Sequence, residues 1–192
     1  RDLIYADYVE NLTIENTVFM NTYYATYLSH CTDAYLFKNT YYDSSLRAIY
    51  VSYGDNIVIA NNTIDNALVG ISFLSAQGTI ENNTIFGTEA NSWGIEIYIS
   101  SDPVVLSNNK LFKVPIVIES TSLTSTQSST FDNNKLNDKN VTVYINQNDI
   151  NFDSIVDGEI ICMFCDNVSI TNSNISCIGF VSGDNVNIRA LH

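Results

Sequence analysis

A short phrase of apolar and polar positions recurs along most of the chain. It consists of an apolar residue, a polar turn rich in asparagine, and a second apolar residue five positions after the first. A period of 20–50 residues indicates a repeat architecture. The clear copies are Ile59–Ile64, Ile80–Ile85, Leu106–Leu111 and Phe131–Leu136, and weaker copies are Ile14–Phe19, Leu36–Tyr41 and Ile170–Ile175.

Upstream of each phrase lies a short stretch that alternates inward, outward and inward, which predicts a half-buried strand. A second alternating strand ends at the phrase, and a third short strand follows its turn. No stretch shows a helical period, so helical content should be very low. The first strands are expected at Ile4–Ala6, Thr26–Leu28, Ile49–Val51, Ile71–Phe73, Ile95–Ile97, Ile116–Ile118 and Val141–Val143.

Three short strands in about 22 residues predict one coil of a β-solenoid per repeat, each strand pairing in parallel with its counterparts in the neighbouring coils. We therefore expect an all-β fold of about eight to nine coils, with residues 1–192 forming one domain that is a segment of a longer chain. The pattern falters near 146–157, which we expect to be an irregular loop or a degenerate coil. Residues 120–130 are rich in Ser and Thr and indicate a smaller insertion.

Asparagine occupies two neighbouring columns of the repeat. The first column suits the left-handed backbone of a tight turn, which asparagine tolerates. The second should form a ladder in which amides bond along the solenoid axis. We interpret this ladder as structural rather than as a binding surface; its members are Asn39, Asn62, Asn83, Asn109 and Asn134.

Charge narrows the possible partners. The formal net charge is −13, and the chain has only 8 Lys and Arg residues. Phosphate binding needs clustered basic residues, so a nucleic-acid partner is not expected. No apolar run reaches the length of a membrane span. The turns between strands carry an intermittent acidic edge at Glu10, Asp55, Asp102, Asp166 and Asp184. We interpret it as solvated and predict no metal site and no cofactor, with Ca²⁺ as the alternative.

Cysteine and sequon positions add little chemistry. Cys31, Cys162, Cys165 and Cys177 fit two disulfides or structural thiols better than a metal site, because no second close pair or nearby His completes one. Asn-x-Ser/Thr triplets arise readily in a chain with 25 asparagines. If the protein is secreted, the candidate glycosylation sites outside the repeat turn are Asn11, Asn140, Asn167 and Asn174.

Tyrosine is concentrated in the first part of the chain, where ten of the twelve precede residue 54. The outward position of the first strand reads Tyr5, Tyr27, Tyr50, Ser72 and Glu96 in successive coils. Such a row can bind sugar rings or a protein, or can simply stabilise the sheet by cross-strand contact. Glu96 stands alone in this column, and Arg47 has no adjacent carboxylate there. We interpret His30 as a turn residue.

The tandem Ile-x-Asn-Asn-Thr-Ile phrases and the Gly-Ile-x-Ile run in Trp93–Ile97 resemble the repeats of the pectate-lyase-like superfamily. The nearest variety is the Asn-rich repeat of NosD-like periplasmic proteins and archaeal cell-surface proteins. The resemblance covers residues 1–140 and, more weakly, 160–190. It implies a single-stranded right-handed parallel β-helix. The superfamily includes polysaccharide lyases and hydrolases, viral tailspikes, surface-layer proteins and adhesins, and no catalytic motif of theirs is matched here.

These observations favour a non-enzymatic structural or adhesive module of a cell-surface, surface-layer or filament protein, located outside the cell, on its surface or in the periplasm. The alternative is a polysaccharide-binding or polysaccharide-degrading domain, and a viral tail-fibre segment is the third possibility. Expected partners are neighbouring domains, or copies of the chain, contacted through the solenoid ends. Polysaccharide is a further possible partner, with Tyr5, Tyr27, Tyr50 and Glu96 as the candidate ligand-binding residues.

Overall fold

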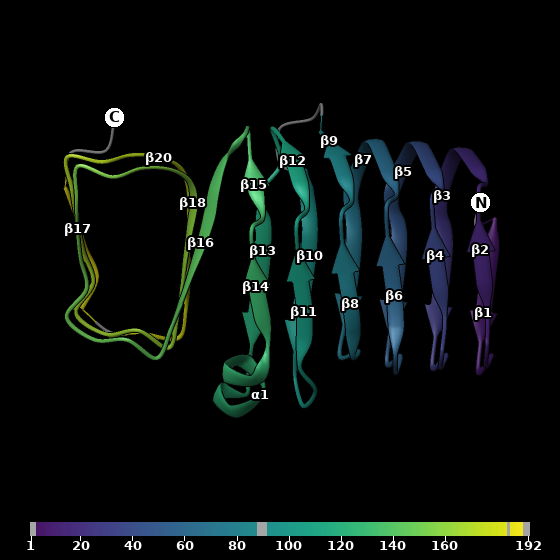
Figure 1. Cartoon of the computed structure of the whole chain (residues 1–192), viewed down its shortest axis with the longest axis horizontal. Helices are drawn as coiled ribbons and strands as arrows, with labels where there is room; N and C mark the ends of the chain where they lie inside the picture. Colours follow the sequence, from purple (N-terminus) through teal and green to yellow (C-terminus); the bar gives the residue numbers. More distant parts are fainter. Residues whose placement is uncertain (1–2, 88–91, 184, 190–192) are drawn as a thin grey trace.

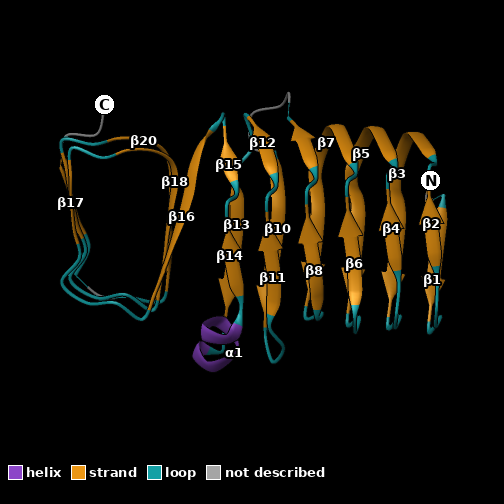
Figure 2. Ribbon diagram, viewed as in Figure 1, coloured by secondary structure: helices purple, strands orange, loops and turns teal. Residues whose placement is uncertain are grey.

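A computed structural model describes residues 3–87, 92–183 and 185–189. The fold is an all-β solenoid with two consecutive stacks of coils, and Figure 1 shows the first stack from the side and the second along its axis. The single helix among the described residues, α1 (Leu123–Ser128), projects from a turn of the first stack, as Figure 2 shows. It occupies the Ser- and Thr-rich insertion predicted at 120–130.

Two parallel sheets form the walls of the first stack, and in each sheet a strand pairs with its counterparts one coil before and one coil after. The first wall contains β1 (Ile4–Asp7), β3 (Val18–Ser29), β5 (Thr40–Ser52), β7 (Thr63–Leu74), β9 (Thr84–Phe86), β10 (Trp93–Ile99), β12 (Lys110–Phe112), β13 (Ile116–Ser120) and β15 (Lys135–Leu136). The second contains β2 (Thr13–Glu15), β4 (Tyr35–Phe37), β6 (Ile57–Ala60), β8 (Gly78–Glu81), β11 (Val104–Ser107) and β14 (Thr130–Asp132).

In the early coils, the short strand after the asparagine turn continues into the first strand of the next coil. The resulting strands, β3, β5 and β7, each bend at an irregularity in the register, between Thr22 and Tyr24 in β3 and between Ser44 and Arg47 in β5. Residues with positive φ lie close to these bends, Asn21 at 55° and Asp43 at 53°. Asparagine and aspartate adopt this backbone readily, so the chain turns a corner without leaving the sheet.

The core of the first stack is a set of apolar columns. The residue that opens each repeat phrase points inward and stacks on its counterparts, because parallel pairing aligns equivalent positions at every coil. One such column is at most 6% exposed and consists of Ile14, Leu36, Ile59, Ile80 and Leu106. A second lies one or two residues before the end of the longer first-wall strands and includes Leu28, Val51, Phe73, Ile97 and Ile118.

A buried asparagine column runs beside these apolar columns. Asn39, Asn62, Asn83, Asn109 and Asn134 are all at most 3% exposed. Each Oδ1 accepts the backbone N–H of the equivalent residue one coil earlier, from Thr17 onward, at 2.9–3.1 Å. Each Nδ2 donates to a carbonyl of the preceding coil, as Asn83 does to Ile59 at 2.9 Å. The column therefore satisfies polar groups that the tight turn would otherwise leave buried and unpaired.

The neighbouring asparagine column adopts the left-handed backbone that the tight turn requires. Its φ values lie between 49° and 56° for Asn16, Asn61, Asn82, Asn108, Asn133 and Asn172. These residues are exposed and form an outer column, whereas the buried asparagines form an inner column with a different structural role. The inner side chains bond along the axis, and the outer backbones reverse the chain.

The second stack begins where the chain reverses direction. β15 pairs antiparallel with β16 (Lys139–Ile145) across the turn at Asn137 and Asp138, whose φ values are 51° and 63°. The prediction that Val141–Val143 continues the column of Ile116–Ile118 is therefore wrong. These residues pair instead with Glu159–Ile161 of β18, because the antiparallel turn carries β16 away from β13.

Coils of the second stack are shorter, with equivalent residues 18 positions apart, as in Asn151, Ser169 and Asn187. Residues 146–157, where the repeat pattern falters, contribute to the first of these coils. After β16, the strands of the second stack are β17 (Asn151–Asp153), β18 (Val156–Met163), β19 (Ser169–Thr171), β20 (Asn174–Val181) and β21 (Asn187–Arg189). Val186 is 39% exposed, because no described coil stacks beyond it.

The sheet formed by β16, β18 and β20 has two apolar faces. Residues such as Val143, Ile161 and Met163 pack against the core of the first stack. The alternate residues Ile160 and Cys162 belong to the separate core of the second stack. This sheet therefore closes part of the end of the first stack as well as forming a wall of the second.

Candidate ligand-binding face

The predicted tyrosine row lies on the outer surface of the first wall. Tyr5 pairs with Tyr27, and Tyr27 pairs with Tyr50, so the three rings follow the solenoid axis. The ring centroids of Tyr5 and Tyr27 are 5.0 Å apart, those of Tyr27 and Tyr50 are 4.6 Å apart, and both pairs are edge-to-face. Each ring therefore supports its neighbour in the geometry that aromatic pairs prefer.

Tyr24 widens this row into a surface. Its ring centroid lies 5.4 Å from that of Tyr27 and 5.7 Å from that of Tyr50. Tyr5 is 59% exposed, while Tyr24, Tyr27 and Tyr50 are half-buried. We call the surface formed by these four residues the tyrosine face. Tyr24 was not among the predicted residues of this row, because the bend in β3 shifts its register by one residue relative to β5.

Arg47 and Glu96 close one end of the tyrosine face. The Arg47 guanidinium carbon lies 5.2 Å from the ring centroid of Tyr50, and Nη2 lies 3.2 Å from Glu96 Oε2. Ser72, fully buried, donates its hydroxyl to the same oxygen at 2.5 Å. Arg47 and Glu96 therefore form an ion pair, which was not predicted because Arg47 has no adjacent carboxylate in the strand column. The arginine side chain extends from β5 past β7 to β10, so the contact does not follow from the residues of a single column.

A depression of about 290 Å³ lies beside this ion pair. Its lining brings together Tyr50 of β5, Glu96 and Tyr98 of β10, and Glu119 of β13. Burial raises the pKa of Tyr50, with the neighbouring Tyr27 adding to the shift. The Tyr50 hydroxyl therefore stays neutral and able to donate a hydrogen bond at physiological pH. Sequence analysis missed Glu119, which lies two residues further along its strand than the column of Glu96.

A second aromatic row follows the turn at the edge of the same wall. The His30 ring stacks between those of Tyr8 and Tyr53, with centroid distances of 4.6 and 5.1 Å. All three residues have positive φ, between 50° and 54°. His30 Nδ1 lies 3.5 Å from Asp7, and His30 and Tyr53 are exposed. His30 thus occupies a turn beside the tyrosine face.

The remaining candidate residues are dispersed. Within residues 3–87, 92–183 and 185–189, no group of three or more His, Cys, Asp or Glu side chains could hold a metal ion. All four cysteines are free thiols. Along the acidic edge Glu10, Asp55 and Asp102 are exposed, and Asp184 lies outside the described residues. The candidate glycosylation sites Asn11, Asn140, Asn167 and Asn174 are all exposed.

The described part of the chain contains no helix that is both long and apolar enough to cross a membrane. Comparison with known proteins gives one family match, to the family described as right handed beta helix region, over residues 2–135. No curated protein matches the chain. No solved structure matches it either.

Proposed function

The chain belongs to the right-handed β-helix family, and from this premise we propose that it is a non-enzymatic extracellular module that binds a polysaccharide along its tyrosine face. In this proposal the solenoid is a rigid support and the binding serves adhesion or surface assembly. The observation that carries it is the tyrosine row that runs from Tyr5 to Tyr50 and ends at the Arg47–Glu96 pair.

The chemistry of this surface suits an extended sugar chain. Aromatic rings offer apolar area to the C–H face of a sugar and polar hydroxyls to its edges. Tyr5, Tyr27 and Tyr50 occupy three successive coils, about 4.8 Å apart, so a polymer lying along the axis meets a tyrosine at each of these coils. Arg47 and Glu96 add one donor group and one acceptor group at the end of the row. The rings contact one another, which fixes their positions before any ligand arrives.

Binding to a panel of acidic and neutral polysaccharides tests the proposal. We expect the Tyr27→Ala, Tyr50→Ala double variant to bind the best polysaccharide at least tenfold more weakly, since each ring contributes on the order of 1 kcal/mol. Tyr35→Ala is the matched control, because Tyr35 is 45% exposed and lies on the other wall. An equal loss in both proteins, or no binding by the wild type, would exclude the tyrosine face as the site.

A polysaccharide hydrolase is the second candidate, favoured by one observation. Glu96 and Glu119 line the same depression next to the tyrosine face. Paired carboxyl groups are the catalytic equipment of most glycoside hydrolases. The same panel, scored for chain cleavage, separates the two functions. Cleavage that disappears in Glu119→Gln would replace the adhesive proposal with an enzymatic one.

We also propose that the module joins neighbouring domains or further copies through its ends. Among the described residues β1 pairs only with β3, and β2 only with β4. The first coil therefore presents two unpaired strand edges. The association state measured by light scattering over a concentration series tests this proposal. A monomer that stays unchanged at every concentration would contradict the association of copies through these edges.

A further inference from the structure

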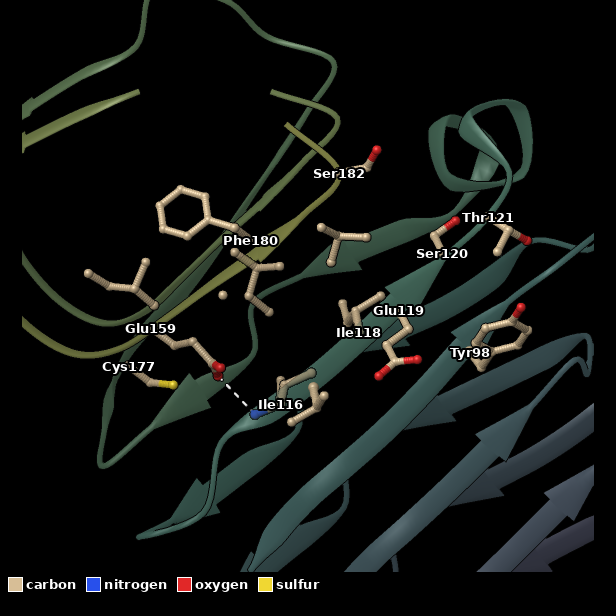
Figure 3. Close-up of a pocket in the computed structure, with 15 residues that line it drawn as sticks. Tyr98, Ile116, Ile118, Glu119, Ser120, Thr121, Glu159, Cys177, Phe180 and Ser182 are labelled. Carbon is tan, nitrogen blue, oxygen red and sulfur yellow. Dashed lines mark hydrogen bonds between the residues drawn. The ribbon is translucent and has the colours of Figure 1, made fainter. Parts of the chain in front are cut away.

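β13, a first-wall strand near the end of the first stack, has an open edge. Among the described residues β13 pairs with β10 and with no other strand. On its other side β18 and β20 lie across a groove of about 510 Å³, shown in Figure 3. The groove is walled by apolar residues of both stacks, including Ile116, Ile118, Ile161 and Val181.

Glu159 accepts a backbone hydrogen bond from the open edge of β13 that a neighbouring strand would otherwise accept. This β18 residue is 1% exposed, and its Oε2 accepts the backbone N–H of Ile116 at 2.9 Å (Figure 3). Its other oxygen, Oε1, is buried and accepts no N–H or O–H group among the described residues, and the Cys177 thiol lies beside this carboxyl group. A buried acceptor without a donor is costly, so a donor that enters the groove here would be stabilised.

Strand geometry determines which backbone groups face the groove. The Thr121 N–H donates to Ile99 of β10, on the paired side. Neighbouring residues of a strand turn their backbone groups to opposite sides. The N–H and C=O groups of Ile118 therefore point to the same side as the Ile116 N–H, toward the groove. They are the groups that another strand would use.

The repeat pattern indicates what kind of strand fits. Every earlier first strand places apolar residues inward, and Val141–Val143 is the copy that the pattern assigns to the place beside Ile116–Ile118. That segment pairs with β18 instead, which leaves the second edge of β13 open. A strand added here would align two inward residues with Ile116 and Ile118, and an outward residue with Glu119.

The charge of the groove selects the outward residue. Its lining includes the exposed Glu119 and the buried Glu159 but no Lys, Arg or His. The chain as a whole carries a formal charge of −13. Opposite charges directly across neighbouring strands are favourable, and like charges are not. A basic residue beside Glu119 is therefore preferred.

We propose that β13 binds an extended segment of a basic partner protein as an added parallel strand, with apolar residues beside Ile116 and Ile118 and a Lys or Arg beside Glu119. The segment exchanges main-chain hydrogen bonds with Ile118. Its first N–H is offered to Oε1 of Glu159. Affinity then comes from the backbone, and specificity from the alternate side chains.

The probe is the acetylated and amidated hexapeptide Asn-Val-Thr-Val-Lys-Ile, which is residues 140–145 with Lys in place of Tyr144. Titration calorimetry gives its affinity for the intact protein, and NMR follows the backbone amide of Ile118. We expect saturable binding that shifts this amide. A peptide with Glu in place of the Lys should bind at least tenfold more weakly. The protein variant Glu119→Gln should lose threefold to tenfold affinity for the Lys peptide and none for a norleucine peptide.

Two further peptides test the hydrogen bonds themselves. One carries N-methyl groups on its first, third and fifth nitrogens, and the other on its second, fourth and sixth. A strand bonds to β13 through only one of these sets, so one peptide should lose at least tenfold in affinity and the other much less. Equal effects of the two methylation patterns, displacement of the probe by n-butylamine alone, or no binding up to millimolar peptide would overturn the proposal.

Discussion

Replacing Asn83 with alanine tests the central structural feature of the first stack, the buried asparagine column. The Asn83 carboxamide makes four hydrogen bonds, each of 2.9 or 3.0 Å. It accepts from the backbone N–H and from Nδ2 of Asn62, and it donates to Ile59 and to Asn109. Alanine removes all four at a position that is 0% exposed.

The expected cost follows from the groups left behind. The Asn62 N–H loses its acceptor in the interior, and an unsatisfied buried donor costs about 1–3 kcal/mol. The Asn62 carboxamide keeps two other acceptors, the carbonyls of Leu36 and Ala60, so its loss is small. The carbonyl of Ile59 and the carboxamide of Asn109 each lose one bond, worth about 1 kcal/mol or less. The sum is a decrease of about 3 kcal/mol in the free energy of unfolding.

Urea unfolding followed by circular dichroism measures this decrease. Asn82→Gly is the matched control, because Asn82 is exposed, has a φ of 55°, and precedes Asn83 in the same turn. Glycine accepts positive φ without strain, so this variant should stay within about 0.5 kcal/mol of the wild type. A loss below about 1 kcal/mol for Asn83→Ala, or equal losses for both variants, would refute the reasoning.

Two further predictions concern packing and pH. Gly78→Ala should lower the free energy of unfolding by about 3 kcal/mol, since a Cβ there would overlap the Ile57 carbonyl. Gly179→Ala is the control and should be nearly neutral, because the nearest neighbours of a Cβ there are Ile161 carbons at 3.9 Å. The thermal midpoint of Gly78→Ala should therefore be the lower of the two, and equal midpoints would contradict the packing at Gly78. Burial raises the pKa of Glu159 from its ordinary value of 4.5 to about 7, so the folded state binds the carboxyl proton more tightly than the unfolded state does. The stability that this protonation provides is present below pH 4.5 and is lost as the pH rises through about 7. Because each pKa unit corresponds to 1.36 kcal/mol, the free energy of unfolding of Glu159→Gln minus that of the wild type should rise by about 3 kcal/mol between pH 4.5 and pH 8; a difference that does not change with pH would show that Glu159 ionises normally in the folded protein.

The regular part of the fold could be predicted because stacking converts sequence period into contact. Positions such as Ile59 and Ile80 recur at the same place in each repeat, and parallel pairing then requires them to lie in one column. The tyrosine row follows from the same rule. Pairing within a column involves only the nearest coil, so the sequence spacing carries all the information that is needed.

The second stack lacked this signal. Phe152 opens its first complete coil, but Ser154 and Ile155 stand in place of the asparagine pair. In the next coil Ser173 takes the place of the ladder asparagine, and its hydroxyl accepts the Ile155 N–H at 3.1 Å. The turn that redirects β16 is decided by pairing with β15, which competes with pairing to β13. No local pattern reveals which pairing is more stable.

Contacts made by long polar side chains could not be predicted from the repeat pattern either. Arg47 reaches Glu96 across a difference of 49 positions, and Glu159 reaches Ile116 across 43. Both contacts depend on side-chain length and on the bends in the walls rather than on column membership. The polar groups beside the two candidate sites were therefore visible only in the folded chain.

The asparagine column has a direction, and this has a consequence for how the protein is made. Each Oδ1 accepts an N–H from the coil before it, so a coil is completed only when the next one has docked. In repeat proteins each unit contacts only its neighbours, and synthesis delivers them from the N-terminus. During translation the newest coil on the ribosome therefore always retains one unfilled amide, which favours growth of the rod in register from the oldest coil to the youngest.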